Sequence, residues 1–161
     1  MRIISGKYKS RKLLFKKSLE LRPTQDRVKE TMFNVISNKI VGSSCLDLFA
    51  GSGSLGFEAI SRGANKVSLI DIDTEFLKKN HALLNNDSAV KIIKGNAINY
   101  LKKVNETYDI VFIDPPWKKS VLFEHALKAI FEFDILKING ILVCEHPIEY
   151  NNFYLFSVMI Q

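Results

Sequence analysis

The pattern that most constrains the fold begins at Cys45, where short apolar runs start to alternate with amphipathic stretches. The apolar, β-rich runs fall near residues 45–49, 66–71, 90–94, 109–113 and 141–145. Helical patterns fall near residues 54–62, 74–85, 97–103 and 120–132, and Thr74 is the expected N-cap of the second of them. This alternation predicts an α/β, Rossmann-like fold, with helices on both faces of a mostly parallel twisted sheet. Ligands of such sheets bind beyond the C-terminal ends of the strands.

A glycine-rich turn follows the first of these strands, in the stretch Asp47-Leu48-Phe49-Ala50-Gly51-Ser52-Gly53-Ser54-Leu55-Gly56. The spacing G-x-G-x-x-G between a strand and a helix permits a tight turn and a close approach of the backbone to a nucleotide, and an acid about twenty residues further on binds the ribose. Asp71, at the end of the next strand, is the preferred candidate for that acid, and Asp73 is the alternative.

The acid ahead of the glycines discriminates between two nucleotide cofactors. Asp47 would place a carboxylate at the mouth of the loop, where it repels a pyrophosphate such as that of NAD. S-adenosylmethionine carries an ammonium and a sulfonium group and no phosphate, so the sequence favours this methyl donor. Asn96, which follows the third strand, is placed to meet the adenine edge, because its amide offers both a donor and an acceptor.

A rigid corner, Asp114-Pro115-Pro116-Trp117, follows the fourth apolar run. Two consecutive prolines can neither extend a sheet nor start a helix at once. A carboxylate, a carbonyl and an aromatic face together suit a planar heterocycle with an exocyclic amine, since the amine can donate to Asp114 and to the Pro115 carbonyl while the ring stacks on Trp117. A capped strand end with Trp117 in the core is the alternative.

Charge is unevenly distributed along the 161 residues, which have a formal net charge of +6. Residues 1–29 contain ten Lys or Arg and two acidic residues, whereas the rest of the chain contains thirteen and fifteen. A basic arm on a slightly acidic body indicates a polyanionic partner, with a solubilising terminus as the alternative. We expect residues 1 to about 16 to form a β-hairpin or arm, with basic side chains here and just beyond available for the phosphates of a nucleic acid: Arg2, Lys7, Lys9, Arg11, Lys12, Lys16 and Lys17.

Arg22-Pro23-Thr24 is expected to open a helix with Thr24 as its N-cap, and Gly42-Ser43-Ser44 is expected to end it. Apolar residues at helical spacing predict one buried face: Val28, Met32, Val35, Ile36 and Ile40. Arg22 and Arg27 are candidates for an anion near the helix start, although a solvated surface role suits either residue alone.

The remaining reactive side chains are expected to be structural. Cys45 and Cys144 lie in apolar runs and are interpreted as buried, reduced thiols. The histidines and cysteines are not spaced as a metal site, so no metal is expected. Glu58 is assigned to helix packing or to support of the glycine loop, with a direct donor contact as the alternative. No apolar run reaches the ~20 residues of a membrane span, and the N-terminus lacks the apolar core of a signal peptide, so we expect a cytoplasmic protein.

The glycine loop, the strand-end acid and the Pro-Pro corner together resemble class I S-adenosylmethionine-dependent amino-methyltransferases. The chain is more narrowly similar to the bacterial small-subunit rRNA guanine-N2 methyltransferases of the RsmD type. The resemblance extends from residue 2 to about 146 and rests on these stretches: Arg2-Ile3-Ile4-Ser5-Gly6, Arg22-Pro23-Thr24-Gln25-Asp26-Arg27-Val28-Lys29-Glu30, Phe33-Asn34, Asp47-Leu48-Phe49-Ala50-Gly51-Ser52-Gly53, Leu55-Gly56-Phe57-Glu58-Ala59-Ile60-Ser61-Arg62-Gly63-Ala64 and Asp114-Pro115-Pro116.

This resemblance implies methyl transfer from S-adenosylmethionine to the N2 amine of guanine 966 in 16S rRNA, within an assembling small subunit. It implies that Asp114, Pro115 and Trp117 face the guanine and that the Arg22-Pro23-Thr24 segment closes over the donor. The candidate donor-binding residues are Arg22, Thr24, Asp47, Phe49, Ala50, Gly51, Ser52, Gly53, Asp71, Ile72, Asn96 and Ala97. We expect a monomer with one domain, residues 1–161, made of a basic RNA-binding arm (1–21) and a Rossmann-like core (22–161).

Two features depart from the family pattern. Trp117 stands where Phe or Tyr is more common, and the tail after Pro147 can supply one strand, so the final antiparallel pair of the fold is expected to be truncated, leaving a less protected sheet edge. Two other functions remain open. A DNA adenine-N6 or cytosine-N4 methyltransferase could use the same corner, although it generally needs a target-recognition region for which this chain has no room. An rRNA-binding assembly factor without activity is the other, and the intact Asp114 and glycine loop argue against it.

Overall fold

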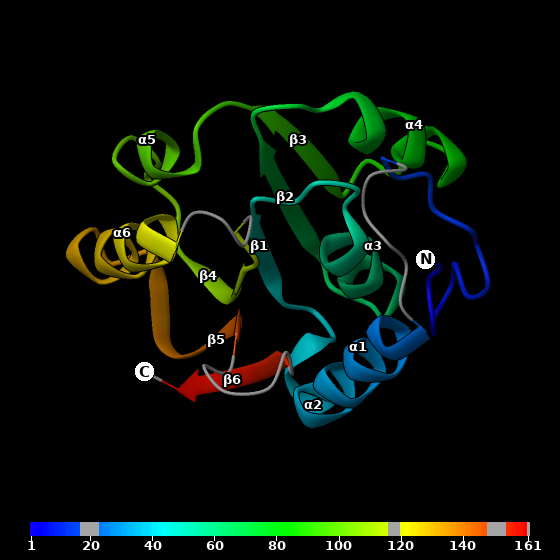
Figure 1. Cartoon of the computed structure of the whole chain (residues 1–161), viewed down its shortest axis with the longest axis horizontal. Coiled ribbons are helices and arrows are strands. Elements are labelled where there is room, and N and C mark those ends of the chain that lie inside the picture. Colours follow the sequence, from blue (N-terminus) through cyan, green and yellow to red (C-terminus); the bar gives the residue numbers. More distant parts are fainter. Residues whose placement is uncertain (17–22, 116–119, 148–153, 161) are drawn as a thin grey trace.

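The computed structural model describes residues 1–16, 23–115, 120–147 and 154–160. The strands form one sheet in the order β3-β2-β1-β4-β5-β6 (Figure 1). Their bounds are β1 Ser44–Leu48, β2 Lys66–Asp71, β3 Val90–Lys94, β4 Tyr108–Ile113, β5 Leu136–Pro147 and β6 Tyr154–Ile160. Strands β1 to β5 pair in parallel, and β6 pairs antiparallel with β5. The predicted Rossmann-like α/β fold is confirmed, with β6 as the strand expected after Pro147.

Helices cover both faces of this sheet (Figure 1). They are α1 Pro23–Val35, α2 Ser37–Ile40, α3 Ser54–Ser61, α4 Glu75–Leu83, α5 Ala97–Leu101 and α6 Ser120–Glu132. Successive residues of the central strands alternate between two hydrophobic clusters. Cys45 and Phe112 join the cluster formed with α1 to α4, whereas Leu46 and Val111 join the one formed with α5 and α6. Burial on both faces explains why these strands appear in the sequence as continuous apolar runs.

The first helical region differs from the expected single helix. The chain ends α1 at Val35 and begins α2 at Ser37, so the exposed fraction of Val35 is 64% and this residue leaves the predicted buried face. Met32, Ile36 and Ile40 are buried as predicted. Since α1 begins at Pro23, Thr24 lies inside its first turn and not at the cap; proline suits the first helical position because its missing N–H has no partner there.

The cap of α4 also differs in detail from the prediction. Thr74 occupies the N-cap position but makes no side-chain cap hydrogen bond. The carboxylate of Asp73 accepts the hydrogen bond from the Glu75 N–H instead, at 3.1 Å.

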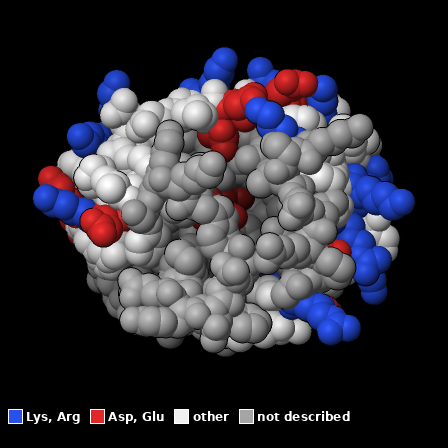
Figure 2. All heavy atoms as spheres, viewed as in Figure 1, with Lys and Arg blue, Asp and Glu red and all other residues white. Residues whose placement is uncertain are grey.

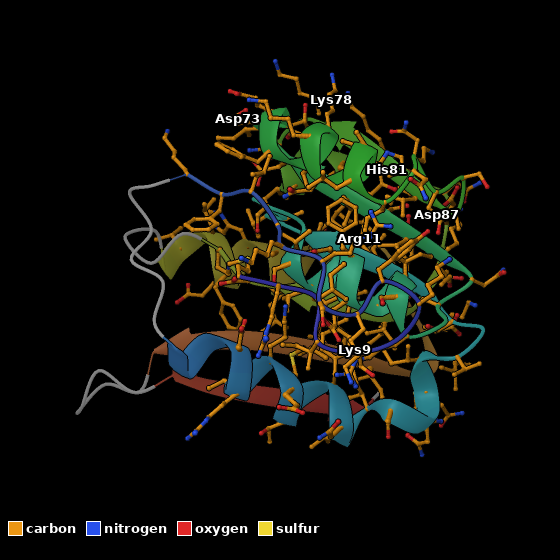
Figure 3. The ribbon with its side chains drawn as sticks, turned by 90° about the vertical axis from the view of Figure 1, so that its right-hand side faces the viewer. Lys9, Arg11, Asp73, Lys78, His81 and Asp87 are labelled. Atoms are coloured by element: carbon orange, nitrogen blue, oxygen red, sulfur yellow. The ribbon has the colours of Figure 1, made fainter. Side chains whose placement is uncertain are left out.

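Residues 1–16, called the N-terminal segment below, were predicted to form a β-hairpin or arm, and they fold back on themselves in a short antiparallel pairing, in which the Ile3 N–H donates to the Arg11 carbonyl and the Leu13 N–H to the Met1 carbonyl. One antiparallel bridge joins Arg2 to Lys12, and Ile3 and Leu13 are buried in the core beside α3 and α4. Gly6 allows the segment to pass against α3, because a Cβ atom on Gly6 would lie 1.8 Å from the Ser61 carbonyl oxygen. The segment is therefore packed on the body of the protein (Figures 1 and 3).

Two further expectations concern the core and membranes. Cys45 and Cys144 are buried free thiols, and burial raises the pKa of each to about 12, as expected of unreactive core residues. Within the described ranges, the helices are too short and too polar to cross a bilayer.

Candidate active site

Three neighbouring strands end together at the centre of the sheet. Leu48 of β1 pairs with Ile70 of β2 on one side and with Ile113 of β4 on the other. The residues that follow these partners are Phe49, Asp71 and Asp114, so the glycine loop begins between two acids. From β1 the chain continues to β2 and β3 on one side and then crosses to β4 and β5 on the other. Ligands of such sheets bind at the point where the strand order reverses in this way. Figure 2 shows acidic atoms near the centre of the view.

The glycine loop, residues 49–53, makes the predicted tight turn. Phe49, Gly51 and Gly53 all have positive φ angles, of 61°, 56° and 80°. The Ala50 N–H donates to the Ile70 carbonyl, and the Gly53 N–H donates back to the Ala50 carbonyl at 2.7 Å. A side chain at Gly53 would collide with the Phe57 ring, 2.3 Å from a built Cβ atom. The conformation of the loop is therefore fixed by its own backbone hydrogen bonds and by packing against α3.

Asp71 is placed beside this loop, as the sequence predicted. One of its carboxylate oxygens accepts from the Gly51 N–H at 2.8 Å, and the other accepts from the Asp73 N–H at 2.9 Å. Asp73 is exposed and is engaged at the start of α4. Ile72 is a large apolar side chain with 69% of its surface exposed, next to Asp71. Asp71 is thus the better placed of the two candidate acids.

Asp47 does not lie at the mouth of the loop, which corrects the prediction. It is 2% exposed and sits beneath the loop, where its carboxylate accepts from the Gly56 N–H of α3 at 2.9 Å. Burial, reinforced by the nearby charges of Asp114 and Asp71, raises the pKa of Asp47 to about 8. In this structure Asp47 therefore supports the loop from below.

The structure shows which atoms of Asn96, Ala50 and Ala97 can contact a ligand. The Asn96 Oδ1 atom accepts from the Asn99 N–H at 3.0 Å and caps α5, so its NH₂ group and the second lone pair of Oδ1 remain for a ligand edge. Ala50 and Ala97 are buried, at 9% and 4% exposure, which limits them to backbone contacts. Ser52 is half-buried, and its hydroxyl donates to the Met1 sulfur at 3.1 Å.

Asp114 and Pro115 follow β4 directly and are half-buried beside the loop. Pro116 and Trp117 lie outside the described residues, as does Arg22. Thr24 belongs to the first turn of α1, and its side chain lies outside the described part of the chain. The stacking role of Trp117 and the closure of Arg22 over the donor remain predictions.

Of the seven basic residues assigned to nucleic acid, Lys17 lies outside the described residues and Lys16 is exposed at the end of the N-terminal segment; the other five divide into two groups. Three are engaged: Arg2 with Asp26 at 3.5 Å, Lys7 with Asp87 at 2.6 Å, and Arg11 with the Leu83 carbonyl. Lys9 and Lys12 are exposed and form no ion pair with the described residues. Figure 2 shows basic side chains gathered along the edge where Figure 1 places the N-terminal segment, and Figure 3 shows Lys9 and Arg11 on that surface.

Glu58 has a role that its sequence neighbours did not reveal. It is fully buried in α3 and accepts from the Ile4 N–H at 2.7 Å and from the Ser5 N–H at 3.1 Å. Its carboxylate also accepts from the Arg62 Nε–H at 2.7 Å and lies 3.7 Å from the Lys29 ammonium. Glu58 therefore anchors the N-terminal segment and does not support the glycine loop directly. The one available signal was a charged residue within an apolar helical stretch.

Among the described residues, no group of three or more His, Cys, Asp or Glu side chains is arranged to hold a metal ion. That the protein functions without a metal ion remains a prediction.

Comparison with known proteins places this geometry in a family. Residues 1–158 match the family described as conserved hypothetical protein 95. The chain is 42% identical to the ribosomal RNA small subunit methyltransferase D of Buchnera aphidicola over 149 residues, covering 90% of this chain and 75% of that protein. It is 41% identical to the Escherichia coli protein of the same name, covering 90% of this chain and 71% of the other.

A solved structure gives the same assignment. It is yhhF of Escherichia coli, assigned as a methyltransferase, which superimposes with a TM-score of 0.83 at 37% identity and covers 94% of this chain and 83% of its own. The chain therefore belongs to the conserved hypothetical protein 95 family, a family of methyltransferases.

Proposed function

We propose that this protein transfers a methyl group from S-adenosylmethionine to the exocyclic N2 of guanine 966 in small-subunit rRNA. Relatives at 41–42% identity carry the name of small-subunit rRNA methyltransferases. The observation that carries the proposal is the strand register, in which Leu48 pairs with both Ile70 and Ile113. This register brings a donor-type glycine loop between Asp71 and Asp114, so a donor and an acceptor base can meet at one sheet edge.

The acidic edge suits the proposed donor. The Asp114 carboxylate would repel a pyrophosphate, whereas it would attract a donor with an ammonium and a sulfonium group. Asp71 would bind ribose in either class of cofactor. S-adenosylmethionine would supply an electrophilic methyl group when bound. Asp71 is placed to accept from ribose hydroxyls beside Gly51, and the exposed Ile72 offers an apolar surface to the adenine ring.

Asp114 and Pro115 would act on the amine of the guanine. The lone pair of that amine is delocalised into the ring, so it is a weak nucleophile until its geometry changes. Hydrogen bonds from the two N–H groups to the Asp114 carboxylate and the Pro115 carbonyl favour a pyramidal nitrogen and aim its lone pair at the methyl carbon. As the N–C bond forms, the S–C bond of the donor would break and S-adenosylhomocysteine would leave, and the Asp114 carboxylate would accept the proton that the methylated amine releases. Orientation and preorganised electrostatics would provide most of the rate.

The N-terminal segment supports an RNA substrate. Lys9 and Lys12 are exposed on its surface, where they can contact phosphates and position the RNA without selecting a base. A guanine held in a folded RNA must be unstacked, which costs about a few kcal/mol, and stacking on an aromatic residue recovers ~1–3 kcal/mol. Trp117 is the proposed stacking residue. We further propose that the protein acts as a single-domain monomer on an assembling small subunit.

Labelled donor tests this function directly. The protein would be incubated with methyl-labelled S-adenosylmethionine and, separately, with 16S rRNA, small subunits from a strain lacking this modification, and DNA. Label in the rRNA or the subunits, mapped by mass spectrometry of nuclease fragments to N2 of guanine 966, is the expected result. Label at another position would overturn the assigned nucleotide. Label in DNA would support the adenine or cytosine DNA methyltransferase, and no label on any substrate would support an inactive assembly factor.

A further inference from the structure

A buried amide side chain joins the N-terminal segment to the glycine loop. Asn80 of α4 is fully buried. Its Oδ1 atom accepts from the Leu14 N–H at 2.7 Å, and its Nδ2 group donates to the Leu14 carbonyl at 2.8 Å and to the Ser52 carbonyl at 2.8 Å. Both N–H groups and the oxygen are therefore used. The Asn80 side chain makes two hydrogen bonds with the Leu14 backbone, as a neighbouring β-strand would. Its second N–H donates to the Ser52 carbonyl of the loop.

A second buried side chain contacts the residue that directly follows the same loop. Lys29 of α1 is 4% exposed, and its ammonium donates to the Arg2 carbonyl at 2.7 Å and to the Ser54 hydroxyl at 3.0 Å. Ser52 and Ser54 flank Gly53. The N-terminal segment is thus linked through Asn80 to Ser52 in the loop and through Lys29 to Ser54, the first residue of α3. The bridge between Arg2 and Lys12 ties these two attachment points together.

We propose that Asn80 is a positioning residue that couples the donor loop to the N-terminal segment, so that donor and rRNA strengthen each other's binding. This inference rests on the proposed function for the identity of the two ligands. Asn80 touches neither ligand; it acts through the Ser52 carbonyl on one side and the Leu14 backbone on the other.

The sign of the coupling follows from the shared contacts. A donor seated on the loop restricts the position of the Ser52 carbonyl, and the same carbonyl position is required for the Asn80 side chain to hold Leu14. Ordering the loop therefore lowers the entropy cost of ordering the segment that carries Lys9 and Lys12. Linkage makes the effect reciprocal, so rRNA must tighten donor binding by the same factor. Couplings of this kind are about fivefold or larger.

The test compares the coupling factor, which is the change in rRNA affinity caused by a bound donor analogue, between the parent protein and Asn80→Asp. This change keeps the shape of the side chain but replaces its donor group with an oxygen that faces two carbonyl oxygens. The dissociation constant for a 16S rRNA transcript would be measured with and without S-adenosylhomocysteine, an unreactive donor analogue. We expect at least about fivefold tightening in the parent protein and a factor near one in Asn80→Asp.

The control is Asn85→Asp, which adds the same charge just beyond α4 at an exposed asparagine. It should keep the parent coupling factor. If folded Asn80→Asp also keeps the parent factor, or if the analogue weakens rRNA binding to the parent protein, the inference is overturned. Should Asn80→Asp fail to fold, Asn80→Ser decides, because it shortens the side chain and removes its contacts with Leu14 and Ser52. A reduced factor supports the inference, and an unchanged factor overturns it.

Hydrogen exchange separates this inference from the proposed function. If the parent protein does not methylate rRNA, the function fails, but the Leu14 amide still reports on the link because its N–H donates to Asn80. S-adenosylhomocysteine alone should slow exchange at this amide at least about fivefold in the parent and leave it unchanged in Asn80→Asp. Equal slowing in both proteins, or in neither, would overturn the link itself.

Discussion

The strand ends that form the candidate active site and the N-terminal segment are held by different kinds of contact. The ends of β2, β1 and β4 are aligned by continuous backbone pairing on both sides of β1. The segment has one backbone bridge of its own and depends on side chains of α3 and α4, chiefly Glu58 and Asn80. Backbone pairing is redundant, so losing one side chain leaves the strand ends in place. The segment is held by separate side-chain contacts, among them those of Glu58, Asn80 and Asp87, and a single substitution can remove each of these contacts.

Among the substitutions that test this difference, Glu58→Ala is expected to have the largest effect, which is a loss of stability. The substitution removes the acceptor for two backbone N–H groups and leaves the buried charges of Lys29 and Arg62 without their partner. Breaking a buried pair in this way costs ~3–5 kcal/mol. We expect thermal unfolding to shift down by ~6–20 °C, with early loss of protection at the Ile4 and Ser5 amides in hydrogen exchange. Glu30→Ala, at an exposed position of α1, should change little, and a mild effect of Glu58→Ala would refute the anchoring role.

Asp114→Ala, at the strand ends of the candidate active site, should lower turnover and leave stability unchanged. Loss of one preorganised acceptor at the reacting amine is expected to lower kcat by ~10²–10³-fold. Donor affinity measured by calorimetry should stay near that of the parent protein, since Asp71 and the glycine loop remain. Glu124→Ala, on the exposed surface of α6, is the matched control. Equal losses of donor binding and turnover would contradict the assignment.

The two regions should also respond to pH with opposite signs. The pKa of Asp47 rises from 3.8 to about 8 on folding, so its contribution to stability is complete below pH 4 and is lost as the pH rises to about 8. Asp47→Asn should therefore be more stable than the parent at pH 9, by ~1–3 kcal/mol, with the advantage vanishing near pH 4. A difference between the melting curves that does not change from pH 4 to 9 would disprove this.

Asp87, which holds the N-terminal segment, supplies the opposite case. Burial opposes ionisation, but hydrogen bonds from Lys7, the Ala89 N–H and Tyr8 outweigh it and lower the pKa of Asp87 to about 2. Its stabilising contribution is present above pH 4 and lost as the pH falls towards 2. Asp87→Asn should melt earlier than the parent at pH 7, and the two curves should converge at pH 2. Divergence on acidification would be the wrong sign.

The smallest effect is expected from the exposed lysines of the segment. Replacing Lys9 and Lys12 together by alanine should weaken rRNA binding about equally for all sequences, and lower the slope of log K against log salt by ~1–2. Lys39→Ala on α2, a similarly exposed position, serves as the comparison. Filter binding at several salt concentrations measures both quantities. An unchanged slope in the double variant would show that the RNA follows another surface.

Residues that act through a local pattern were predicted well. The glycine loop, Asp71 and the strands around them follow from periodicity and from the positive φ angles that Gly51 and Gly53 permit. Asp47 was assigned the right neighbourhood but the wrong depth, because the sequence does not show which side of the loop a strand residue faces. Asn96 was placed correctly at its strand end, and the sequence did not show that its oxygen also caps α5.

By itself, the sequence determined the order of strands and helices, the position of the glycine loop and the excess of positive charge near the N-terminus. These depend on residues close together in the chain, whose backbone preferences and hydrophobic spacing are visible in a short window. Only the tertiary structure decided that the basic segment lies on α3 and α4, through Glu58 and Asn80, which bond to residues 53 to 66 positions away. A buried polar side chain must find a partner, but its partner can come from any part of the chain that folding brings within hydrogen-bond distance.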